Sequence, residues 1–237
     1  LLFSTGSATN GKGGDILVSI GAGTTYNGGD FILTAGETTA ASSIGGQVLV
    51  TAGKGSHTTN GEGGAVVLTG GVGASMTGGM ISLSTGYGTA TTSGSIAVKS
   101  VNAGTSGVSG SLRFSSGTTS NGASGAITIE TGAATSGKSG SIVLSVGDGN
   151  TGAGGDVEMF GGLSNGATGG AISIATGYGK TTSSGTLTIQ SVNAGTAGVS
   201  GGLSFRSGTT SAGSSGEITI TSGAATNGKG GDISLAV

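Results

Sequence analysis

The chain has 237 residues, of which 57 are Gly and none is Pro or Cys; charged residues make up 8% and the formal net charge is −2. This composition excludes a basic surface for nucleic acid or an anionic membrane, and it excludes disulfides and thiolate metal sites. No apolar run reaches the roughly 18 residues of a transmembrane helix. Collagen is excluded because Gly does not recur at every third position.

One short phrase recurs along the whole chain: Gly or Ser, then Gly, then two apolar residues that alternate with other residues. We number each repeat from the second Gly of the phrase as position 0. The spacing is 15 residues in most repeats and 16 to 18 in the others. The position 0 glycines are Gly14, Gly29, Gly46, Gly64, Gly79, Gly94, Gly110, Gly125, Gly140, Gly155, Gly170, Gly185, Gly201, Gly216 and Gly231.

Such a short, fixed period is typical of solenoids, in which each repeat buries its apolar side by stacking on its neighbours. The sequence therefore predicts an all-β fold: one continuous β-solenoid over 1–237, similar to a parallel β-helix, with about 15 residues per coil and about fifteen stacked coils. An alternative stays open, in which two repeats, together about 30 residues, form one coil. It is favoured by a near copy of residues 85–146 at 176–237, an offset of 91 residues or six repeats.

Positions 2 and 4 are apolar in every repeat, and these thirty residues form the predicted core. Side chains alternate between the two faces of a strand, so positions 2 and 4 face the same side. Position 2 holds Ile16, Phe31, Val48, Val66, Ile81, Ile96, Leu112, Ile127, Ile142, Val157, Ile172, Leu187, Leu203, Ile218 and Ile233. Position 4 holds Val18, Leu33, Val50, Leu68, Leu83, Val98, Phe114, Ile129, Leu144, Met159, Ile174, Ile189, Phe205, Ile220 and Leu235. A Gly at position 7 of most repeats predicts a second corner in each coil.

Position 3 should face outward, yet it is apolar in the first four repeats. The residues concerned are Leu17, Ile32, Leu49 and Val67. An apolar stripe on an outer face usually marks a contact, so we expect these residues to form a lateral contact in one continuous file. The chain starts and stops without a capping segment, which predicts a fragment of a longer repeat protein that associates end to end or laterally.

No group of residues predicts catalysis, a cofactor or a metal. Asp156 and Glu158 share one face, but the flanking repeats offer no outward cation, and we expect a solvated acidic spot. Lys99, Arg113 and Glu130 lie on outward positions of successive repeats and predict a surface ion-pair group. Four Asp residues follow Gly-Gly, as in calcium-binding β-rolls, but their spacing differs from that motif. They are Asp15, Asp30, Asp156 and Asp232.

The phrases at 100–110, at 191–201 and at 115–125 resemble the Gly/Ser/Thr-rich repeat proteins of diatoms and related algae. The looser pattern Gly-Gly-x-Val-x-Leu is similar to tandem repeats of phage tail fibres. This resemblance implies an extracellular or cell-surface protein that is structural or adhesive. The predicted function is therefore a non-enzymatic segment of an extracellular fibre, cell wall or adhesin. The alternative is a module that recognises ice or polysaccharide, because position 5 is Ser or Thr in the first five repeats before Lys99 interrupts the series.

Overall fold

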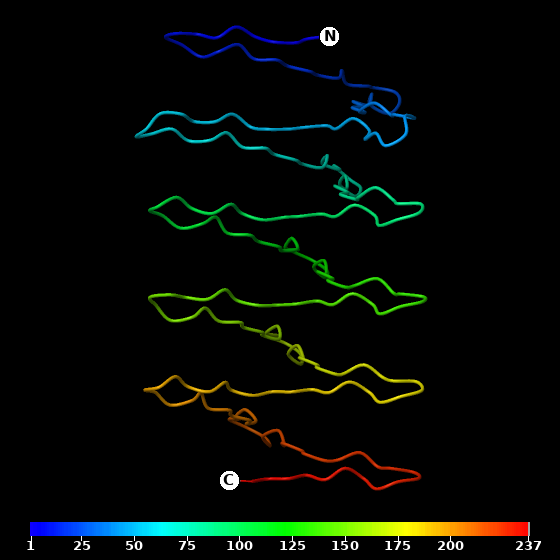
Figure 1. The fold of residues 1–237 in the computed structure, drawn as a ribbon, viewed down its shortest axis with the longest axis vertical. Coiled ribbons are helices and arrows are strands. Elements are labelled where there is room, and N and C mark those ends of the chain that lie inside the picture. Colours follow the sequence, from blue (N-terminus) through cyan, green and yellow to red (C-terminus); the bar gives the residue numbers. More distant parts are fainter. Residues whose placement is uncertain (237) are drawn as a thin grey trace. The chain divides into compact units, whose positions relative to one another are not determined.

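The computed structural model describes residues 1–236, and none of these residues lies in a helix or a strand. Figure 1 accordingly draws the described chain as a plain ribbon without coils or arrows. The predicted β-solenoid is therefore wrong, both with one repeat per coil and with two. A solenoid needs a ladder of backbone hydrogen bonds between successive coils. Within residues 1–236, every backbone–backbone hydrogen bond instead joins two residues of the same loop.

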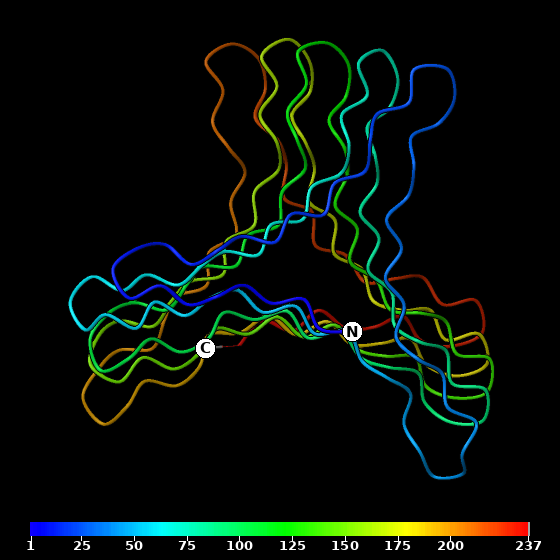
Figure 2. The same cartoon turned by 90° about the horizontal axis from the view of Figure 1, so that it is seen from above.

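The chain divides into two units, Leu1–Gly125 and Ala126–Val237. Within each unit, extended stretches alternate with narrow loops, whose rounded tips are visible in Figures 1 and 2. One sharp bend lies a few residues before each of the fifteen position 0 glycines. The bends fall at residues 9–11, 24–26, 40–42, 58–60, 74–76, 89–91, 105–107, 120–122, 135–137, 150–152, 165–167, 180–182, 196–198, 211–213 and 226–228.

Glycines close the base of several loops. The N–H of a position 0 glycine donates to the carbonyl of the position 7 glycine in the preceding repeat. In Leu1–Gly125 these bonds run from Gly46 to Gly36, Gly64 to Gly53, Gly79 to Gly71 and Gly94 to Gly86, at 2.8 to 3.1 Å. In Ala126–Val237 they run from Gly170 to Gly162 and Gly185 to Gly177, at 2.8 and 3.0 Å. The two glycine positions that predicted solenoid corners thus face each other across a loop.

The two glycines of the pair Gly170 and Gly162 have different steric surroundings. A Cβ on Gly170 would lie 2.8 Å from the backbone nitrogen of Gly162, a distance that real Cβ atoms do not reach. A Cβ on Gly162 would have no atom within 4 Å. Only the position 0 residue of this pair is therefore restricted to Gly by close approach of the opposite limb.

We predict that Gly170→Ala opens this loop and that Gly162→Ala does not. The added methyl must push the two limbs apart, and the bond it breaks contributes about 1 kcal/mol, or about a fivefold change in the closed population. The temperature coefficient of the residue 170 amide proton, measured by NMR, reports this bond. It should become that of a solvated amide in Gly170→Ala and stay at the wild-type value in Gly162→Ala. Equal coefficients in the two variants would contradict the loop geometry.

The predicted core is also wrong: none of the residues that the structure describes is buried. The thirty side chains at positions 2 and 4 range in exposure from 51% for Ile142 to 93% for Leu235. Burial requires a second layer against the apolar face, and within residues 1–236 no such layer buries these side chains. The accessible surface is 23191 Å², whereas a folded protein of 21.7 kDa exposes about 9,200 Å² and its unfolded chain about 31,000 Å².

Candidate functional site

The most prominent surface feature is a set of short extended stretches in which positions 2, 3 and 4 of a repeat all hold Ile, Leu, Val or Phe. We call them the apolar segments. Four lie in Leu1–Gly125, at residues 16–18, 31–33, 48–50 and 66–68, and contain the four residues predicted for lateral contact. Because neighbouring side chains point to opposite faces of an extended chain, each apolar segment presents apolar surface on both sides. Neither face of an apolar segment therefore carries polar groups that could form hydrogen bonds with water at these three positions.

The central residues of these four segments are their most exposed side chains. Leu17, Ile32, Leu49 and Val67 are 77% to 87% exposed, more than the residues on either side of them. Each lies in the middle of its own extended segment. The predicted continuous file depended on hydrogen-bonded coils, which the described residues lack. The lateral contact itself stays a prediction.

A fifth apolar segment lies at residues 142–144 in Ala126–Val237. Its central residue, Val143, is 79% exposed and lies between Ile142 and Leu144. Sequence reasoning missed this segment because it followed position 3 only through the first repeats. The same register identifies Val143 as a position 3 residue, so the signal was present in the sequence.

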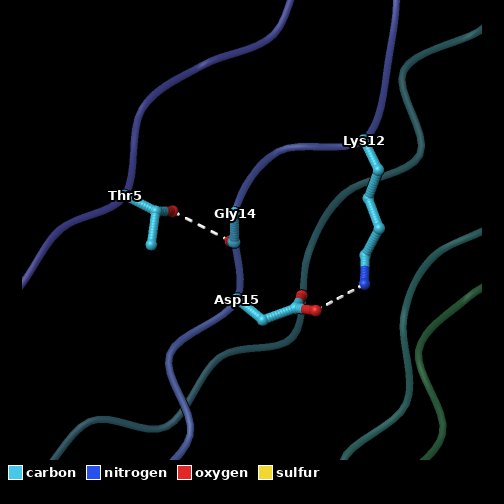
Figure 3. A network of polar contacts seen from close by, with 4 residues as sticks. All are labelled: Thr5, Lys12, Gly14 and Asp15. Atoms are coloured by element: carbon cyan, nitrogen blue, oxygen red, sulfur yellow. Dashed lines mark hydrogen bonds and ion pairs between the residues drawn. The ribbon is translucent and has the colours of Figure 1, made fainter.

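Polar contacts in the described chain are few and local. Figure 3 shows the first loop, in which the Thr5 hydroxyl donates to the Gly14 carbonyl at 2.9 Å and the Lys12 ammonium lies 2.6 Å from Oδ2 of Asp15. An equivalent pair joins Lys229 to Asp232 at 2.9 Å. All four charged side chains are exposed, so each ion pair contributes at most about 1 kcal/mol.

The charged residues that the sequence singled out are exposed and lie in both units. Lys99 and Arg113 lie in Leu1–Gly125, whereas Glu130, the acid of the predicted ion-pair group, belongs to Ala126–Val237, so this ion-pair group stays a prediction. Asp156 and Glu158 are exposed and form no ion pair in the described part of Ala126–Val237. Lys99 instead lines an open hollow with the next three residues along the chain, 100–102.

His57 takes part in a turn. Its Nδ1 accepts from the backbone N–H groups of Thr59 and Asn60 at 3.4 and 3.3 Å, while the N–H of Gly61 donates to the His57 carbonyl at 3.1 Å. The ring therefore stabilises one bend of the chain. Among residues 1–236 there is no group of three His, Cys, Asp or Glu side chains placed to hold a metal ion.

Comparison with protein-family models, with curated proteins and with solved structures found no match. In residues 1–236 there is also no helix that is long and apolar enough to cross a membrane. The apolar segments are the principal feature of the surface that the structure describes.

Proposed function

We propose that this chain is a non-enzymatic structural segment that acts through self-association, as part of an extracellular fibre, a cell wall or an adhesin. One observation carries the proposal: every repeat exposes its alternating apolar residues, from Ile16 in the first repeat to Leu235 in the last. Exposed apolar surface on this scale favours association in water, because burying it is favourable in proportion to its area.

The distribution of this surface supports a structural role over a binding site for a small molecule. Small-molecule sites are concave and bring a few polar groups together. Here the apolar residues recur in all fifteen repeats, and the hollow at 99–102 is formed by one short stretch of chain. A surface that repeats along the chain is typical of proteins that form extended assemblies.

The proposal is tested with the purified chain and with native material. We expect sedimentation to show concentration-dependent assembly, and electron microscopy of immunolabelled native material to place the protein in extracellular fibres or walls. A chain that stays monomeric at millimolar concentration, or labelling confined to the cell interior, would contradict the proposal. Assays of glycan cleavage and of ice recrystallisation should be negative; activity in the second would favour the alternative, a module that recognises a surface.

A further inference from the structure

We infer that copies of this chain associate in parallel and in register, so that each repeat pairs edge to edge with the same repeat of the next copy. This inference rests on the proposed function and adds to it the identity of the partner and the geometry of the contact. Four observations lead to it: the amount of exposed surface, the unpaired backbone, the irregular spacing of the repeats and the distribution of charge.

The exposed area requires contact along the whole chain. The accessible surface of 23191 Å² exceeds that of a compact protein of the same mass by about 14,000 Å². A standard protein–protein interface buries only about 1,600 Å² in total. One docking patch would therefore leave most of the excess exposed, whereas a partner that follows every repeat can cover it.

The backbone of the extended segments is available for pairing. Folded proteins form about one internal hydrogen bond per residue, most of them between backbone groups. The seven backbone–backbone bonds in residues 1–236 lie at loop bases and in the turn at 57–61, and none involves positions 1 to 5 of a repeat. Both edges of these segments therefore present unpaired N–H and C=O groups, which pair with an extended chain added along the edge.

The spacing of the repeats selects an identical copy in the same register. The intervals from Gly29 to Gly46 and from Gly46 to Gly64 are 17 and 18 residues, against 15 in most other repeats. A parallel copy in register matches all fifteen repeats, including these two. A copy shifted by 91 residues aligns the repeats of Gly64 to Gly140 with those of Gly155 to Gly231, but leaves the first three out of phase.

The amino-acid composition is compatible with parallel stacking in register, which places each side chain next to the same side chain of the neighbouring copy. Like charges then face each other, and this chain has only eight Lys and Arg and ten Asp and Glu residues. Proline, which would remove an N–H from the pairing, is absent. Gly202 is the only glycine at positions 1 to 5 in the fifteen repeats. The other fourteen extended segments therefore carry a side chain at each of these five positions.

Spin labels test the register directly, because the chain contains no Cys and a single substitution gives a single label. Ser82 and Ser173 both occupy position 3 and are 91 residues apart. In assemblies of spin-labelled Ser82→Cys, in-register pairing places identical labels about 4.8 Å apart. We expect an exchange-narrowed electron paramagnetic resonance spectrum, which should broaden into separate lines when labelled chains are diluted tenfold with unlabelled chains. Labelled Ser173→Cys should behave in the same way.

The other outcomes overturn the inference and locate the error. Spectra without narrowing in the single-label assemblies, together with strong coupling when the two labelled chains are mixed, would show the 91-residue shift. Assemblies that show neither effect would exclude both parallel registers while leaving the proposed structural function in place. A chain that does not assemble at any concentration would contradict the proposed function and this inference together.

Discussion

Ile129→Asp should block assembly of this chain while leaving the dilute single chain unchanged. Ile129 is 71% exposed, so the new carboxylate stays hydrated as long as the chain is alone. In the assembly it would lie in the apolar layer against its own copy, where an unpaired polar group costs about 2 kcal/mol or more. Since each 1.4 kcal/mol corresponds to a factor of ten, the critical concentration should rise at least about thirtyfold.

The matched control is Thr128→Asp, which adds the same charge one residue earlier, on the opposite face. Its effect on the critical concentration should be several times smaller, because the neighbouring residues on that face are mostly polar. Circular dichroism of dilute samples should be the same for both variants and the wild type. A change of the dilute spectrum in Ile129→Asp alone would show that Ile129 is packed within the single chain.

Replacing Leu17, Ile32, Leu49 and Val67 together with Thr should weaken assembly strongly and leave the conformation of the single chain unchanged. Burying each of these side chains contributes about 1.5 to 3 kcal/mol, and Thr retains only part of that. Light scattering over a concentration series measures the effect. The control Ser82→Thr with Ser173→Thr places Thr at position 3 where the chain is already polar, and it should assemble as the wild type does. Equal assembly of the fourfold variant would show that these residues lie outside the contact.

The local pattern of this chain could be predicted, but its pairing could not. The alternation of apolar Ile172 and Ile174 with Ser173 and the glycines at positions 0 and 7 follow from neighbouring residues, and the structure shows an extended segment there and loop bases at Gly170 and Gly185. The partner that covers an apolar face comes from a distant part of the chain or from another molecule, and neighbouring residues do not determine it. The repeats are so alike that stacking on the next repeat and stacking on another copy satisfy the same pattern, and the pattern therefore does not decide which of the two covers positions 2 and 4.

At the candidate site, too, local features could be predicted and long-range contacts could not. The exposure of Leu17 could be predicted because position 3 has a fixed direction along an extended segment. The ion pair between Lys12 and Asp15 follows from their spacing of three residues across one turn. An ion pair of Lys99 or Arg113 with Glu130 requires residues from different repeats and from both units to approach each other, which their spacing along the chain does not decide.

Hydrogen exchange followed by mass spectrometry at two concentrations tests the central claim, that the apolar segments are covered only by other copies of the chain. In a dilute monomeric sample, peptides that span positions 1 to 5 should exchange as fast as unstructured peptides. Above the critical concentration, the same peptides should become strongly protected while the loop tips, such as 105–107, exchange faster. Strong protection of positions 1 to 5 that is already complete in the dilute monomer would contradict the account, because it would require pairing within the single chain.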